Sequence, residues 1–217
     1  MAKSSARQML GQSAYQIILD FIREGVYPPG GRLREEEVAE RLGISRTPVR
    51  EAFGRLQEKG LLQAAPGRGL EIATLNMEQV FELYAMRGEL EALVAQFAAQ
   101  HVTAAEIANL EELNIEFAAA GSPQEAAKLN RAFHARLYDA ARNRYLRAAV
   151  EDLQETIALL PQTTFTQAAR LESAASEHVS MIKAISERDG KAAADAARDH
   201  ISRSLATRLT LIRAGNI

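Results

Sequence analysis

Three of the four histidines in this chain lie on or beside apolar stripes that helical spacing turns toward a core: His134, His178 and His200. Asn130 precedes His134 by four residues, so the two side chains share one helix face and can reach a common point. Imidazole nitrogens suit zinc and related divalent ions, and an amide oxygen can complete a mixed ligand set. This pattern indicates a divalent metal site, for which we expect zinc, with nickel or manganese as alternatives.

The same histidines also have a simpler interpretation. A histidine on a buried helix face can be a hydrogen-bonded core residue, and three widely separated histidines need not converge in space. Spacing alone leaves both interpretations open. The fourth histidine, His101, falls at the end of a helical segment and is predicted to be a surface residue.

Arg87 lies in a long helical segment that comes before the segments of these three histidines. Its guanidinium could hold the carboxylate of a small organic acid by paired hydrogen bonds, next to a metal ion with open coordination positions. The competing interpretation is a weak surface ion pair with Glu91, one helical turn later. Both interpretations remain open at this point.

Arg46 and Arg50 lie four residues apart at the start of a predicted helix, where guanidiniums suit phosphate contact or bidentate reading of a guanine edge. The preceding helix is predicted to end at Gly43, a residue free to take a left-handed conformation. Ser45 or Thr47 is the expected N-cap of the second helix. The core side of the second helix is formed by Val49, Ala52, Phe53 and Leu56.

Two strands are predicted next, over Leu61–Ala65 and Leu70–Ala73, with Gly67 and Gly69 between them. These glycines let the hairpin tip approach a sugar-phosphate backbone closely. Helix, turn, helix and hairpin in this order predict a winged helix-turn-helix that binds DNA. The alternative is a helical hairpin and a β-hairpin whose arginines only face solvent.

After Asn76 no strand pattern returns, and helical spacing predicts six helices. They cover about 77–100, a segment after Thr103, a segment after Ser122, and about 144–160, 167–188 and 190–212. Capping boxes are expected at Thr103 with Glu106 and at Ser122 with Glu125, and Pro161 is expected to stop the fourth helix. Short joints imply an antiparallel bundle, whose interior is a usual place for a ligand or metal.

The predicted protein is therefore mainly α, with two domains. A winged helix-turn-helix domain covers 8–76, and an antiparallel six-helix bundle for metal binding, effector binding and dimerisation covers 77–217. The length of 217 residues and the apolar content are sufficient for two cores.

Composition narrows the class of protein. The chain has no cysteine, no apolar run long enough to span a bilayer, and no apolar segment of a signal peptide near its start, which together indicate a cytoplasmic protein without membrane contact.

The net charge of −2 is unevenly distributed between the two predicted domains. Residues 1–76 carry 11 Lys+Arg against 9 Asp+Glu, so DNA affinity is expected from placed arginines and dimerisation, not from a broad positive field.

The segment from Leu42 to Ala52, with Tyr27–Gly30 before it and Gly60-Leu61 and Gly67–Gly69 after it, resembles the N-terminal domain of the GntR superfamily of bacterial transcription regulators. The resemblance implies that Arg46, Thr47, Arg50 and Gly69 contact operator DNA. It has one departure: Glu36, with Arg34 nearby, stands where fatty-acid-responsive members have an arginine. The complete predicted DNA-contacting set is Arg34, Ser45, Arg46, Thr47, Arg50, Arg68 and Gly69.

The later pattern of Asn130, Phe133-His134, His178 and Asp199–Ile201 resembles the FCD domain of the FadR branch of that superfamily. Many members hold a metal there with Asp or Asn followed by three histidines. The resemblance implies that the ligands are Asn130, His134, His178 and His200. The amide at 130 removes one negative charge relative to the commoner aspartate. Six helices match the vanillate-regulator-like subgroup.

These observations predict a homodimeric transcription regulator, a repressor, that binds a pseudo-palindromic operator and responds to a small carboxylate effector. No enzymatic activity is expected. Two alternatives remain: a metal-dependent hydrolase in which the three histidines activate water, and a metal-free bundle that serves only dimerisation.

Overall fold

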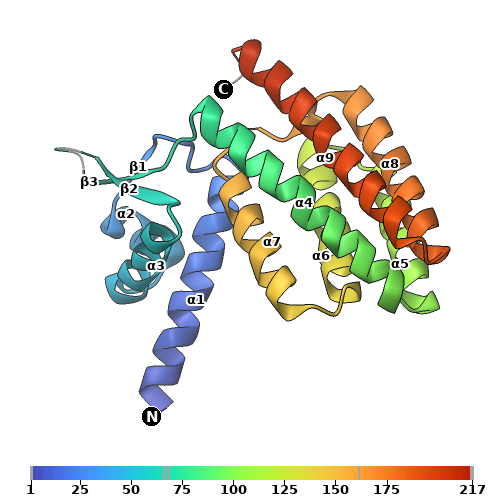
Figure 1. Cartoon of the computed structure of the whole chain (residues 1–217). Helices are drawn as coiled ribbons and strands as arrows, with labels where there is room; N and C mark the ends of the chain where they lie inside the picture. The colour runs from blue at the N-terminus through green and yellow to red at the C-terminus, as the bar shows by residue number, and fades with distance from the viewer. Residues whose placement is uncertain (1, 66, 68, 161, 216–217) are drawn as a thin grey trace. The chain divides into compact units, whose positions relative to one another are not determined.

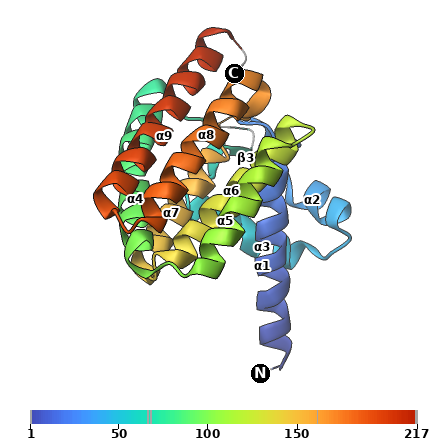
Figure 2. The same cartoon turned by 90° about the vertical axis from the view of Figure 1, so that its right-hand side faces the viewer.

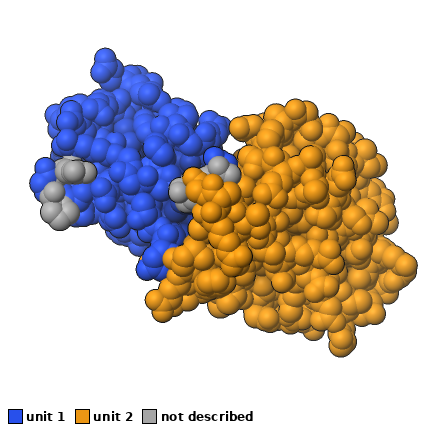
Figure 3. All heavy atoms as spheres, turned by 90° about the horizontal axis from the view of Figure 1, so that it is seen from above, with its two compact units in different colours: residues 1–76, 154–162 blue, residues 77–153, 163–217 orange. Residues whose placement is uncertain are grey.

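The structure is a computed structural model that describes residues 2–65, 67, 69–160 and 162–215, with side chains described from Gly11 onward (Figure 1). Its contacts divide the chain into two units, coloured separately in Figure 3. Unit 1 contains residues 1–76 and 154–162, and unit 2 contains residues 77–153 and 163–217. No helix in the described ranges is long and apolar enough to cross a membrane.

Unit 1 combines helices with a small sheet. Its elements are α1 (Ala2–Arg23), β1 (Arg32–Leu33), α2 (Glu35–Leu42), α3 (Arg46–Glu58), β2 (Leu62–Ala65) and β3 (Gly69–Ile72). The strands pair antiparallel in the order β1-β3-β2. The predicted hairpin is confirmed within one residue at each strand end. Helix α1 and the short strand β1 were not assigned from the sequence.

The turn between α2 and α3 follows the sequence signals closely. Gly43 has a φ of 65°, and the N–H of Ile44 donates to the carbonyl of Ala39, which closes α2 as predicted. Ser45 occupies the N-cap position of α3, as predicted, although its side chain makes no capping hydrogen bond. The predicted core side of α3 is buried: Val49, Ala52, Phe53 and Leu56 are at most 2% exposed.

A segment far along the chain completes the core of unit 1. Ala158 and Leu159, which follow α7, belong to the same apolar cluster as Ile18 of α1 and Phe53 of α3. The Tyr15 hydroxyl donates a 2.6 Å hydrogen bond to the carboxylate of Glu155. The sequence predicts that residues 154–162 belong to the helical bundle, whereas in the structure they group with residues 1–76.

The six helices expected from the sequence are present among the described residues, and all of them lie in unit 2 except the end of α7 from residue 154 onward. They are α4 (Met77–His101), α5 (Ala104–Ala118), α6 (Pro123–Ala140), α7 (Arg144–Ile157), α8 (Ala168–Ser186) and α9 (Gly190–Arg213), with a short 3-10 helix η1 (Thr164–Thr166) before α8. Helix α4 packs on α9, α9 on α8, α8 on α5, α5 on α6, and α6 returns to α4. Figure 2 shows α8 and α9 side by side along this ring. The ring of five helices surrounds the core in which the histidines lie.

Local signals set most of the helix ends. The capping box at Thr103 and Glu106 is present. Ser122 accepts from the N–H of Glu125, but the Glu125 carboxylate accepts from the N–H of Gly121, so the second box is incomplete. Helix α7 ends at Ile157, three residues before the predicted end. Pro161, the predicted stop, lies outside the described residues.

Candidate metal centre and nucleic-acid interface

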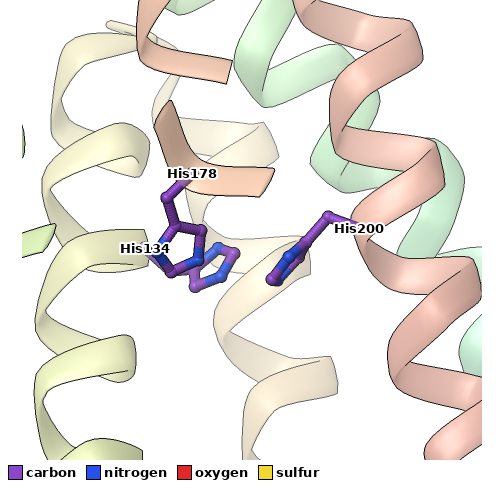
Figure 4. Close-up of side chains that lie close together, drawn as sticks. All are labelled: His134, His178 and His200. Carbon is purple, nitrogen blue, oxygen red and sulfur yellow. The ribbon is translucent and has the colours of Figure 1, made fainter. Parts of the chain in front are cut away.

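The three histidines of the bundle converge in the core of unit 2. His134 comes from α6, His178 from α8 and His200 from α9, and Figure 4 shows their rings turned toward one another. One ring nitrogen of each lies within 4.8 Å of the others, and the residues are at most 2% exposed. The convergence that spacing could not establish is therefore present.

Each imidazole has one nitrogen engaged by an acceptor. The Nδ1 of His134 lies 3.2 Å from Glu91, that of His178 lies 3.0 Å from the Asn114 amide oxygen, and that of His200 lies 2.8 Å from Glu177. Because these partners accept, each Nδ1 carries the proton and donates, which leaves the Nε2 lone pair available. The Nε2 atoms of His134 and His178 are buried without a hydrogen-bond partner among the described residues.

Two of the three imidazoles, those of His178 and His200, favour the neutral form. Burial holds the pKa of His178 and of His200 well below the ordinary value, and the neighbouring histidines and Arg170 lower it further. Burial opposes ionisation of the Glu91 carboxyl, but His134, Arg87 and the Tyr138 hydroxyl outweigh it and lower the pKa of Glu91 to about 2. At neutral pH the rings of His178 and His200 thus offer lone pairs instead of positive charge.

The acceptors that orient the histidines are themselves held in place. Asn114 donates through its amide nitrogen to the carbonyl of Ala175, 3.1 Å away. Arg170 donates to both carboxylate oxygens of Glu177, at 2.8 and 2.9 Å, and it is 4% exposed. Fixed acceptors of this kind set the tautomer and the ring direction of a metal-binding histidine.

Sequence reasoning missed Asn114, Arg170 and Glu177, and considered Glu91 only as an ion-pair partner of Arg87. A signal for Asn114 was present, because this amide lies between Leu110 and Phe117 on the buried side of α5. A polar group at such a position needs a buried partner.

Aromatic rings fix the position of His178. The ring of Phe133 is stacked on it with centroids 4.0 Å apart, and Phe117 lies 5.2 Å away at a tilt. The packing leaves this imidazole little rotational freedom. A fixed ring retains the direction of its lone pair when a ligand arrives.

Asn130 and Arg87 are the other two predicted residues of this site, and both have buried polar atoms. The side-chain oxygen of Asn130, one turn before His134, is buried without a hydrogen-bond partner among the described residues. Arg87 is 7% exposed, and its Nε lies 3.7 Å from Glu91. The Arg87–Glu91 pair therefore exists, but it is buried and is not the surface contact considered from the sequence. His101 is exposed at the end of α4, as predicted.

The predicted DNA-contacting residues gather at the start of α3 and on the hairpin. Ser45, Arg46, Thr47 and Arg50 are exposed at the start of α3, and Arg34 is exposed just before α2. Gly69 begins β3 with a φ of 84°, in the left-handed region that favours glycine. Arg68 lies outside the described residues. An exposed helix start with two guanidiniums, followed by a hairpin, is an arrangement that can enter a DNA groove.

Comparisons with known proteins agree with both halves of the chain. Residues 10–72 match the gntR family of bacterial regulatory proteins, and residues 82–203 match the FCD domain. The transcriptional repressor RspR of Escherichia coli is 31% identical over 197 residues, which cover 89% of this chain and 86% of RspR. The nta operon transcriptional regulator of Aminobacter aminovorans is 36% identical over 133 residues, 60% of this chain and 63% of that protein.

Among solved structures, that of McbR/YncC from E. coli superposes with a TM-score of 0.86 at 23% identity, covering 94% of this chain and 98% of McbR. This likeness confirms the fold class, in which a winged helix-turn-helix is followed by a helical bundle. The matches to both domain families and to RspR also show that this chain is related to these regulators. The chain belongs to the GntR family of bacterial transcriptional regulators, with an FCD domain following its DNA-binding domain.

Proposed function

We propose that this protein is a homodimeric repressor that binds operator DNA through α3 and the β2–β3 hairpin, and whose bundle senses a small organic acid at a metal ion. The observation that carries the sensor half is the buried cluster of three imidazoles with oriented, available nitrogens. DNA binding follows from the family and from the exposed arginines of α3. We also propose that the regulator is cytoplasmic, because the operator DNA that it would bind lies in the bacterial cytoplasm.

The side chains at the cluster fit a divalent metal ion. Nitrogen donors from His134, His178 and His200, with the oxygen of Asn130, would hold it. Two of these nitrogens and that oxygen have no hydrogen-bond partner in the part of the chain that the structure describes. Zinc is the ion that we expect, with nickel or manganese as alternatives. A five- or six-coordinate ion held by these four ligands would offer an open coordination position to a carboxylate.

Arg87 is our proposed second anchor for the effector. A buried guanidinium needs anionic partners, and the Nε of Arg87 has no hydrogen bond among the described residues, with Glu91 at the long distance of 3.7 Å. An incoming carboxylate could accept paired hydrogen bonds from it. Such an effector regulates only if it binds the DNA-competent arrangement and the other arrangement with different affinities.

A thermal-shift screen tests the sensor. Dicarboxylic, sugar and aromatic acids are added to metal-free protein with and without zinc, and the melting temperature is followed. We expect at least one acid to raise the melting temperature only when the ion is present, because ligand and ion share one site. The same acid should have a smaller effect on Arg87→Lys. Equal stabilisation of the metal-free protein would contradict this site.

Arg46→Ala and Arg50→Ala test the DNA-binding half. Each is expected to weaken binding to an operator duplex by about 10- to 100-fold, because a base-reading arginine contributes about this factor. The operator can be obtained by selection from random duplexes and its affinity measured by fluorescence anisotropy. Arg136→Ala, at an exposed arginine of α6, is the control and should bind like the parent. Parental affinity in both α3 variants would refute the recognition-helix assignment.

The homodimer is part of the proposal because two copies match the two half-sites of a pseudo-palindromic operator. Met86 and Leu93, seven residues apart, expose apolar surface on α4. We do not propose the metal-dependent hydrolase, because both matched families are those of regulators. A metal-free bundle would be the outcome if purified protein bound no divalent ion.

A further inference from the structure

The exposed arginines of α3 are paired with carboxylates at the start of α2. Arg50 donates to Glu35 at 2.8, 3.0 and 3.1 Å. The Nη2 of Arg46 lies 2.9 Å from the Glu36 carboxylate and 3.7 Å from that of Glu35. The two arginines of α3 that are proposed to contact DNA therefore have their guanidiniums engaged within unit 1.

The two pairs differ in how tightly they are built. Glu35 has a side chain 24% exposed, and it accepts from both the Nε and the Nη2 of Arg50, which fixes the plane of the guanidinium. Glu36 is 61% exposed and meets Arg46, itself 55% exposed, through one contact. An exposed pair with a single contact contributes little to folding. The Arg46–Glu36 pair can therefore open without disturbing the fold.

A guanidinium binds carboxylate and phosphate with the same edges. For Arg46 to neutralise a DNA phosphate, the Glu36 carboxylate must release it and then remain close to the negatively charged backbone. Every DNA sequence presents phosphates, so this cost applies to all DNA. Only an operator provides additional base contacts that offset it.

We propose that Glu36 competes with DNA phosphates for Arg46 and so lowers the affinity of the protein for DNA of any sequence. The inference rests on the proposed contact between Arg46 and DNA. It gives the one departure from the family pattern a role: a carboxylate at this place reduces the sequence-independent part of the affinity. In a unit with only a mild excess of basic residues, such competition makes binding depend on correctly placed contacts.

Glu40 provides a matched control. It lies one turn after Glu36 on the same face of α2 and is exposed, and no described arginine or lysine forms an ion pair with it. Glu36→Gln and Glu40→Gln each remove one negative charge from the same helix at nearly constant side-chain volume. Only the first of them removes the competitor of Arg46.

The test uses full-length protein and a random-sequence duplex of about 30 base pairs, with affinity measured by fluorescence anisotropy across a salt series. We expect Glu36→Gln to bind the random duplex about 10-fold more tightly at low salt, and Glu40→Gln to change the affinity by less than about 2-fold. The gain should appear with the operator duplex as well, so that the ratio of operator to random-duplex affinity stays close to that of the parent. Equal effects of the two substitutions, or no effect of either, would overturn the proposal.

Combining Glu36→Gln with Arg46→Ala separates this inference from the function on which it rests. If Glu36 acts through Arg46, then its substitution has no effect once Arg46 is absent. A 10-fold gain that persists in the double variant contradicts the competition. If Arg46→Ala alone leaves the affinity for both duplexes unchanged, the proposed role of α3 in DNA binding is wrong. If Arg46→Ala weakens binding but Glu36→Gln has the same effect as Glu40→Gln, only the proposed role of Glu36 is wrong.

Discussion

Replacing His178 by alanine is expected to remove stoichiometric metal binding. His178 is fully buried, and it is the ligand that α8 would contribute. Its loss leaves three donors, from α6 and α9, and of these only two are imidazoles, so the ion should be held much more weakly. The zinc content, measured by elemental analysis after dialysis against buffered zinc, should fall from about one ion per chain to well below that. The stabilisation by zinc, about 4 kcal/mol at a thousandfold excess over the dissociation constant, should disappear with it.

Two further variants separate ligation from packing. His178→Phe retains an aromatic ring against Phe133 but has no nitrogen, so it should lose the ion while keeping more stability than the alanine variant. His101→Ala removes an exposed histidine outside the cluster and should retain the parental metal content. One ion per chain in His178→Ala and in His178→Phe would remove this residue from the ligand set.

Local signals were sufficient for the helix-turn-helix, because its helices are delimited by residues that act on their own neighbours. Gly43 ends α2 through its left-handed backbone, and the buried side of α3 repeats at helical spacing. The same reasoning could have found α1, since Tyr15, Ile18, Leu19 and Ile22 are buried at the same spacing. Strand β1 has only two residues and is defined by its pairing with β3, so no local pattern could have identified it.

The candidate metal site also has a part that local sequence signals predict and a part that they do not. The helices of His134, His178 and His200, and the faces on which they lie, follow from periodicity. Their approach to one point depends on the packing of α6, α8 and α9, which periodicity does not specify. The acceptors for their Nδ1 atoms come from 23 to 64 residues away in the chain. Such partners can be recognised only after the helices are placed in space.

Leu159→Ala is expected to destabilise unit 1, although residue 159 follows the fourth helix of the bundle. Leu159 is 2% exposed in the core formed with α1 and α3. Truncating a buried leucine costs about 2–5 kcal/mol, because apolar contacts are lost and a cavity remains. Hydrogen exchange should therefore accelerate in α1 and α3, and DNA binding should weaken at temperatures where zinc binding is still intact.

Leu146→Ala makes the same chemical change near the other end of α7, in the core of unit 2, and should accelerate exchange in the bundle instead. Faster exchange confined to the bundle in Leu159→Ala would contradict the assignment of this segment to unit 1. The effects of Leu159→Ala and Leu146→Ala therefore test where the boundary between the two units lies. If Leu159 stabilises α1 and α3, a fragment ending at residue 76 lacks part of its own core and is less stable than the same residues in the full chain.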